Sequence, residues 1–213
     1  MSDVSPHGLS PFVSIFFRPR RTIRSIVDIN PRMHVVPIAL VAGGLAAIPS
    51  GLVASASSPV QMSGPSTLVY LTVLGALGGV VGLYISGWLL AFTGRQLGGT
   101  AAPLLVRASV GWSNVPSIAG SVATIVGLMT GAIAMPIYDP ESPLRVSGAL
   151  SGMNPLILGF ATWSFIISLV CLSEVNGFSV LRALLAYFLI AVEIGILVLI
   201  LVFVFVGVPG VGG

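Results

Sequence analysis

The sequence has no lysine, a single cysteine and few charged residues of any kind. Asp, Glu, Lys and Arg together make up 7% of its 213 residues, whereas a soluble domain has roughly 25%. The one cysteine, Cys171, excludes an intrachain disulfide framework and a paired-cysteine metal or redox motif. We interpret it as a small buried hydrophobic residue. So little charge also excludes a soluble globular protein of ordinary composition.

Long apolar runs take the place of the missing charge. Hydrophobic residues make up 55% of the chain, and its mean hydropathy is +1.07. The runs are continuous rather than alternating, which favours membrane-spanning helices over a β-barrel. Each run approaches the roughly 20 residues that a helix needs to cross a bilayer. The sequence therefore predicts an all-α membrane protein with five transmembrane helices, near Val35–Ser55, Thr67–Thr93, Ser117–Pro136, Leu156–Val175 and Val180–Val206.

The arginines predict the orientation, because positively charged short segments stay on the cytoplasmic side. Eight of the nine arginines fall on one side of a five-helix layout, and only Arg145 falls on the other. We expect residues 1–33 to be a cytoplasmic segment, residues 34–207 the transmembrane domain and residues 208–213 a short exoplasmic tail. The pI of about 9.6 comes from arginines beside the membrane. Anionic lipid headgroups are thus the expected partner, and nucleic acid is not.

The N-terminal segment has the pattern of an amphipathic helix on the membrane surface. Apolar and basic residues separate onto two helical faces, with Pro19 at the helix start and Pro31 beyond its end. Such a helix buries its apolar face at the acyl boundary. Two interpretations stay open: an anchor for the helical bundle, or a docking element for a partner. The predicted headgroup contacts are Arg18, Arg20, Arg21 and Arg24.

Small residues recur at spacings of three and four in the first three predicted spans. Such stripes let membrane helices approach closely. We expect the first three spans to form a tight inner bundle, and the uniformly bulky fifth span to face lipid or a second protomer. The predicted packing glycines are Gly75, Gly79 and Gly82 in the second span and Gly120 and Gly127 in the third.

The stretch Leu104–Val115 predicts a short separate helix before the third span. Pro116 disfavours a helical conformation in the residue before it, so we expect a break near Val115. One interpretation is an in-plane or re-entrant helix that lines a polar cavity. The other is an interfacial helix with Trp112 in the aromatic belt.

Glu193 is the one carboxylate predicted at membrane depth, roughly 20 Å into the last span. Two interpretations are open: a proton or cation site, or a neutral acid that hydrogen bonds to a neighbouring helix. Candidate partners are Tyr84, Ser86 and Asn114.

A second candidate pair is Glu174 with Arg182, at the ends of the fourth and fifth spans. Each charge opposes its local helix dipole, so pairing would cancel both penalties. Arg95 or Arg107 could also pair with Glu174. A structural clamp and a gate or ligand contact are the two interpretations. The sequence shows no catalytic set, no metal-ligand cluster and no cofactor motif, and a noncatalytic protein is expected.

Four segments resemble bacterial Yip1-domain proteins: Arg18–Arg24, Gly94–Ala101, Val110–Pro116 and Leu172–Ala183. Their order and spacing agree with that family along most of the chain. The resemblance implies a polytopic protein of the bacterial cytoplasmic membrane with a cytoplasmic N-terminus. Eukaryotic members are associated with Rab-type GTPases and vesicle traffic, but their combined signature of Asp-Leu-Tyr with Gly-Pro is absent here, because the chain has Gly64-Pro65 but no Asp-Leu-Tyr.

Two functions from different classes follow. The first is a noncatalytic Yip1-like protein that organises membrane or partner proteins through its helical bundle and basic cytoplasmic face. The second is a conduit for a small solute, ion, proton or lipid, with Glu193 at its polar centre. Membrane lipids are the expected partners in both, with a protein partner or a homo-oligomer as a further one.

Overall fold

The computed structural model describes residues 10–56, 65–133 and 155–206, and these residues are helical almost throughout. In chain order the helices of these ranges are α1 (Pro11–Phe17), α2 (Pro19–Ile29), α3 (Val35–Ala56), α4 (Pro65–Gln96), α5 (Pro103–Ser113), α6 (Val115–Met129), α8 (Pro155–Asn176) and α9 (Val180–Val206).

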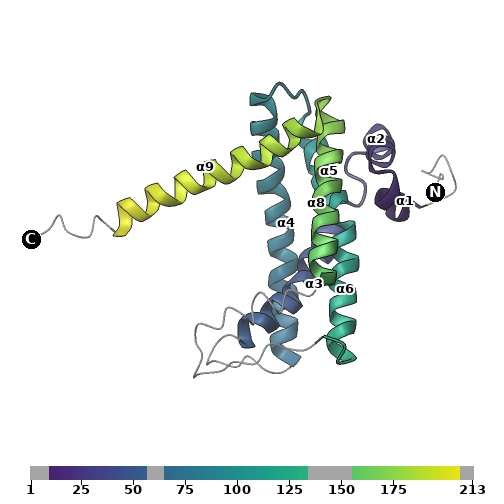
Figure 1. Cartoon of the computed structure of the whole chain (residues 1–213), viewed down its shortest axis with the longest axis vertical. Helices are drawn as coiled ribbons and strands as arrows, with labels where there is room; N and C mark the ends of the chain where they lie inside the picture. Colours follow the sequence, from purple (N-terminus) through teal and green to yellow (C-terminus); the bar gives the residue numbers. More distant parts are fainter. Residues whose placement is uncertain (1–9, 57–64, 134–154, 207–213) are drawn as a thin grey trace, which may run out of the picture.

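The helices form an elongated bundle from which α9 projects (Figure 1). Helices α4, α6 and α8 run along its length, and α3 crosses and packs on α4 and α6. The short α5 lies between α4 and α8 at one end, where α2 also packs on α8. Helix α1 packs on α2 and also contacts α6. Helix α9 contacts α4 and α8 near its start and then runs diagonally away from the bundle.

The predicted apolar runs form helices with nearly the predicted limits, except the third. Helix α6 ends at Met129, followed by the cap residue Thr130 and by Gly131 with a φ of +70°. That left-handed conformation favours glycine and stops a helix. The expected end at Pro136 lies outside the described residues. Within the described ranges, three stretches are long and apolar enough to span a membrane: Ser66–Gln96, Leu158–Asn176 and Val180–Ile200; a shorter apolar helix covers Val35–Gly51.

Glycines set the contact between α3 and α4. A Cβ atom on Gly43 would lie 2.8 Å from the Gly79 Cα, and a Cβ on Gly75 would overlap the Gly43 carbonyl and the Ala47 Cβ. The two backbones therefore touch directly, as small residues allow in membrane helices. The sequence pattern did not single out Gly43.

The other predicted packing glycines differ in what they face. A Cβ on Gly120 would lie 2.6 Å from the Phe160 Cβ, so this residue faces α8. A Cβ on Gly127 would overlap Ile133, which follows α6 in the same chain segment. At Gly82 a Cβ would meet no described atom within 4 Å.

The N-terminal amphipathic pattern forms two helices instead of one, with the break at Arg18 and with Pro19 as the first residue of α2. Its apolar face does not turn to the lipid as predicted. Ile15, Ile23 and Ile26 are fully buried in the core that α5 and α8 share. The physical reason is that α2 lies directly on α8, so its apolar face packs against protein. Phe17, by contrast, is 78% exposed.

The break predicted before the third apolar run is confirmed, and it lies at Asn114, between α5 and α6. The position of Trp112 differs from the aromatic-belt interpretation. Its side chain is fully buried, and the indole N–H donates a hydrogen bond of 3.1 Å to the Met33 carbonyl. A buried indole needs such an acceptor, and the turn between α2 and α3 supplies it.

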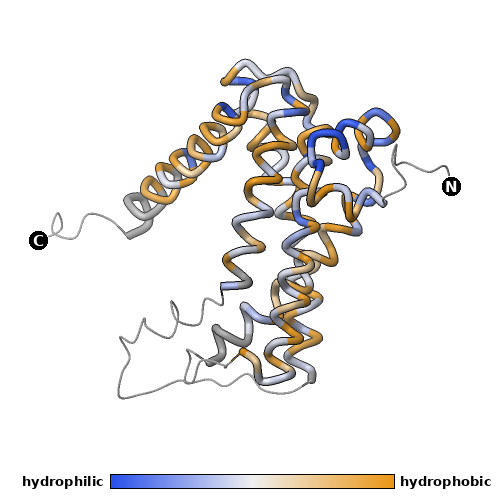
Figure 2. The backbone as a smooth tube through the Cα atoms, turned by 45° about the vertical axis from the view of Figure 1, so that its right-hand side comes forward, coloured by the Kyte–Doolittle hydropathy of each residue, from blue (hydrophilic) through white to orange (hydrophobic). Residues whose placement is uncertain are grey.

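Helix α9 is packed near its start, and its described side chains from Ile194 to Ile200 are exposed. Ala183 and Ala186 are buried, and the hydroxyl groups of Tyr187 and Ser168 hydrogen bond to join α9 to α8. Further along, Val198 and Leu199 are exposed. Figure 2 shows this projecting part as mostly hydrophobic, while hydrophilic residues gather at the end of the bundle near α2.

Candidate functional site at the arginine-rich end

Three of the four segments that carry the family resemblance meet at one end of the molecule, which we call the arginine-rich end, and the fourth, Val110–Pro116, leads from it into α6. This end contains α2, the loop after α4, α5 and the turn between α8 and α9 (Figure 1). Helix α2 packs on both α5 and α8, and α9 packs on α4 and α8. Residues far apart in sequence thus form one compact structure.

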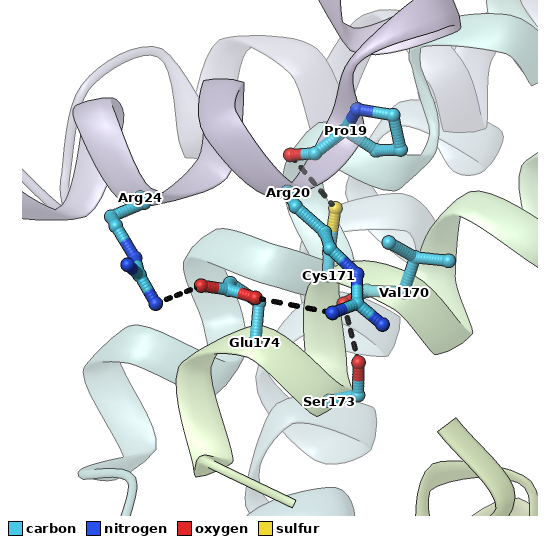
Figure 3. A network of polar contacts seen from close by, with 7 residues as sticks. All are labelled: Pro19, Arg20, Arg24, Val170, Cys171, Ser173 and Glu174. Carbon is cyan, nitrogen blue, oxygen red and sulfur yellow. Dashed lines mark hydrogen bonds and ion pairs between the residues drawn. The ribbon is translucent and has the colours of Figure 1, made fainter. Parts of the chain in front are cut away.

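Glu174 is the electrostatic centre of this end (Figure 3). Its carboxylate forms an ion pair with the Arg24 guanidinium and lies 3.9 Å from the Arg20 guanidinium. The Glu174 side chain is only 13% exposed, whereas those of Arg20 and Arg24 are 59% and 69% exposed. Arg20 and Arg24 are four residues apart on α2, so both reach the same carboxylate.

The predicted pairing of Glu174 with Arg182 is therefore corrected. Helix α2 lies across the last turn of α8 and supplies two guanidinium groups to Glu174. Arg182 lies at the start of α9, where its backbone N–H is 3.4 Å from the Ser179 hydroxyl as that helix begins. The clamp joins α2 to α8 instead of α8 to α9.

The glycine-rich loop after α4 and the turn between α8 and α9 pack together beside this clamp. Asn176 is buried, and its amide donates a hydrogen bond of 3.0 Å to the Leu172 carbonyl. A Cβ on Gly99 would lie 2.5 Å from the Asn176 Oδ1 and 2.9 Å from the Gly94 carbonyl oxygen. The loop after α4 therefore fits over the α8–α9 turn only where it has no side chain.

An aromatic cluster closes the other side of the arginine-rich end. The Phe12 ring lies 5.0 Å from the Trp112 ring and 6.0 Å from the His34 ring, measured between centroids. His34 has a φ of 55°, which turns the chain sharply from α2 into α3. This turn presents the Met33 carbonyl to Trp112. Helix α1 is thus connected to α5 through ring contacts.

The remaining predicted headgroup residues lie on the outer surface of α2. Arg18 and Arg21 are exposed, and neither forms an ion pair with a carboxylate among the described residues. Together with Arg20, Pro19, Phe17 and Val170 they line an open cavity of about 460 Å³ where α1 meets α2. This surface offers positive charge next to exposed apolar side chains.

The structure does not bring Glu193 together with its predicted partners. Glu193 is half-buried on α9, between the exposed residues Val192 and Ile194. Ser86 donates to the Gly82 carbonyl, Asn114 donates to the Val110 carbonyl, and the Tyr84 ring lies under the Arg107 guanidinium. Each side chain thus has a different partner, on its own helix or on α5.

The side chains at the arginine-rich end can bind anions and can hold helices together. Within the described residues, no group of three His, Cys, Asp or Glu side chains gathers as metal ligands. The Glu174 clamp was not predicted with its actual partners, although the spacing of Arg20 and Arg24 on one face of α2 was visible in the sequence. The contact between α2 and α8 brings that face to Glu174, and the sequence does not show this contact.

Comparison with known proteins gives a family and little else. The sequence matches the Yip1 domain over residues 13–203, which is most of the chain. No curated protein and no solved structure matches.

Proposed function

The chain belongs to the Yip1-domain family of membrane proteins, and we propose that it is a noncatalytic organiser of the membrane around it. In this proposal the arginine-rich end faces the cytoplasm, collects anionic lipids and holds a fixed basic surface above the bilayer. The bundle and α9 supply contacts to other membrane proteins or to a second copy.

The observation that carries this proposal is the attachment of α2 to the bundle. Its apolar residues Ile23 and Ile26 are buried, and Glu174 holds Arg20 and Arg24 from the inner side. Arg18 and Arg21 then point their charge outward on a rigid support. Each such arginine near an anionic surface is worth about 1 kcal/mol of attraction.

The protein-contact part of the proposal rests on α9. Glu193 lies on a helix whose neighbouring side chains are exposed, and it lines neither of the cavities formed at α2 or beside α5. A carboxyl group facing hydrocarbon costs about 2.5 to 3.5 kcal/mol. Contact with a second protein surface removes that cost. The same exposure argues against an enclosed conduit centred on Glu193 within a single chain.

The proposal includes five membrane crossings. Helix α6 alone is too short, but α5 and α6 follow one another and together reach about 40 Å at 1.5 Å per residue. This pair would serve as the third crossing, with the break at Asn114 inside it. A cytoplasmic reporter should then be active when fused after Gly99 and inactive when fused after Ser142. The opposite pattern would reverse the orientation.

Lipid enrichment around the protein tests the organising role. The full chain is reconstituted into phosphatidylcholine vesicles with a minor fraction of phosphatidylglycerol, and energy transfer is measured from tryptophan to fluorescently labelled copies of each lipid. We expect stronger transfer to phosphatidylglycerol, and we expect the Arg18→Gln/Arg21→Gln variant to lose much of that preference. The control is Arg145→Gln, which removes one charge from the predicted opposite side.

Equal transfer to both lipids in the unchanged protein would contradict the organising role. A flux assay in the same vesicles tests the conduit. Proton or cation flux above protein-free vesicles that disappears in Glu193→Gln would support a conduit over an organiser.

A further inference from the structure

A second cavity, of about 360 Å³, lies between the start of α3, the middle of α4 and the start of α5. It is separate from the surface of α2 described above. Two arginines and one tyrosine give it polar character, and the rest of its lining is apolar. The lining residues that give it this character are Arg32, Val36, Tyr84, Leu104 and Arg107.

The position of Arg107 is fixed by its neighbours. Its guanidinium carbon lies 4.8 Å from the centre of the Tyr84 ring, and its Nε donates to the Pro103 carbonyl at 3.3 Å. A Cβ on Gly87 would lie 3.4 Å from the Arg107 Cα and would overlap its Cγ. Glycine at this position lets the arginine stem cross α4, and the ring of Tyr84 orients the planar group.

Neither arginine in this cavity has a counter-charge in the described part of the chain. The ion pairs there use Arg20 and Arg24, and no aspartate or glutamate lines the cavity. Arg107 lies against Tyr84 and Gly87, which belong to the membrane-spanning stretch Ser66–Gln96. An unpaired arginine at such a position is costly, so an anion would stabilise it.

The shape and lining of the cavity indicate which anion it would take. Guanidinium groups donate two parallel hydrogen bonds to phosphate oxygens, and two arginines can hold one phosphate from two directions. Val36 and Leu104 add apolar surface beside the charges, and Val36 is exposed on α3. That combination suits a phosphate with an attached hydrocarbon chain better than a fully hydrated ion.

We propose that Arg32, Arg107 and Tyr84 form a binding site for the phosphate of an anionic ligand, with a phospholipid of the surrounding membrane as the source that the apolar lining favours. This site does not depend on the organising role of α2, because it uses different residues on different helices.

The test is saturable binding to the purified full chain in a neutral detergent. The probes are short-chain phosphatidylglycerol, which carries a phosphate with acyl chains, and glycerol phosphate and inorganic phosphate, which carry the phosphate alone. We expect Arg32→Gln and Arg107→Gln each to weaken phosphatidylglycerol binding about tenfold, the loss that one charge-assisted contact implies. The matched control, Arg182→Gln, removes an exposed arginine outside the cavity and should bind as the unchanged protein does.

Two further comparisons keep the test decisive. Arg107→Lys retains the charge and the stem but not the bidentate geometry, so it should also bind less tightly, and it protects the test if Arg107→Gln fails to fold. Phosphatidylglycerol binding well above glycerol phosphate binding identifies a lipid ligand, whereas equal binding of the two identifies a soluble phosphate. The proposal is overturned if no probe binds saturably, or if Arg32→Gln and Arg107→Lys both bind like the unchanged protein.

Discussion

The arginine-rich end and the part of α9 beyond Glu193 are both rich in apolar residues, yet the first is packed, whereas the described side chains of the second are exposed. Trp112 and Leu172 are fully buried at the first, whereas Leu199 is 69% exposed on the second. Lipid tails are as apolar as leucine, so hydrophobicity alone does not draw membrane helices together. The packed region differs in its glycines, its hydrogen-bonding side chains and its ion pairs. These features, more than apolar content, decide which helices associate.

The largest effect should come from placing bulk at a glycine contact. Gly79→Leu forces α3 and α4 apart, because the obstructing atoms belong to the α3 backbone and cannot rotate away. We expect the free energy of unfolding to fall by about 3 kcal/mol or more. This loss should appear as a clearly lower melting temperature in detergent. Gly82→Leu on the same helix and Gly195→Leu on α9 are the controls, because a Cβ there meets no described atom within 4 Å. If all three variants have the same melting temperature, glycine contacts do not distinguish the packed region from the exposed one.

A smaller loss is expected where a buried ring is trimmed. Trp112→Phe leaves a gap in a fully buried site and leaves the Met33 carbonyl without its donor. Together these changes should lower the free energy of unfolding by about 2 kcal/mol. Trp88→Phe is the matched control, because Trp88 is 59% exposed on α4, where it stacks on Phe92. If Trp88→Phe is the more damaging change, the assignment of Trp112 to the core is wrong.

The smallest loss of stability is expected at Glu174, and none is expected at Glu193. Glu174→Gln removes the counter-charge of Arg20 and Arg24, and the cost should be about 1 kcal/mol because both arginines are more than half exposed. Amide hydrogen exchange in α2 should become faster at the same time. Glu193→Gln should leave the melting temperature of the monomer unchanged, because Glu193 forms no ion pair with another described residue. A larger loss in Glu193→Gln would show that α9 has a partner in the purified protein.

Much of this architecture is local and was predictable. Continuous apolar runs gave the helices, Pro19 marked the start of α2, and Pro116 marked the break beside Asn114. What could not be predicted depends on contacts between distant segments. The burial of Trp112, the partners of Glu174 and the role of Gly43 all follow from which helix lies on which. Periodicity identifies a face of a helix but does not say whether protein or lipid covers it.

The central claim is that α2 is a fixed part of the bundle, held on α8 through Glu174. A charge exchange tests it most directly, with melting temperatures measured for Glu174→Arg, Arg24→Glu and the variant that carries both changes. Each single change places like charges together and should destabilise the protein, whereas the double variant restores an opposite-charge pair and should melt above both single variants. If the decrease in melting temperature of the double variant equals the sum of the decreases in the two single variants, α2 and α8 are not coupled through this pair.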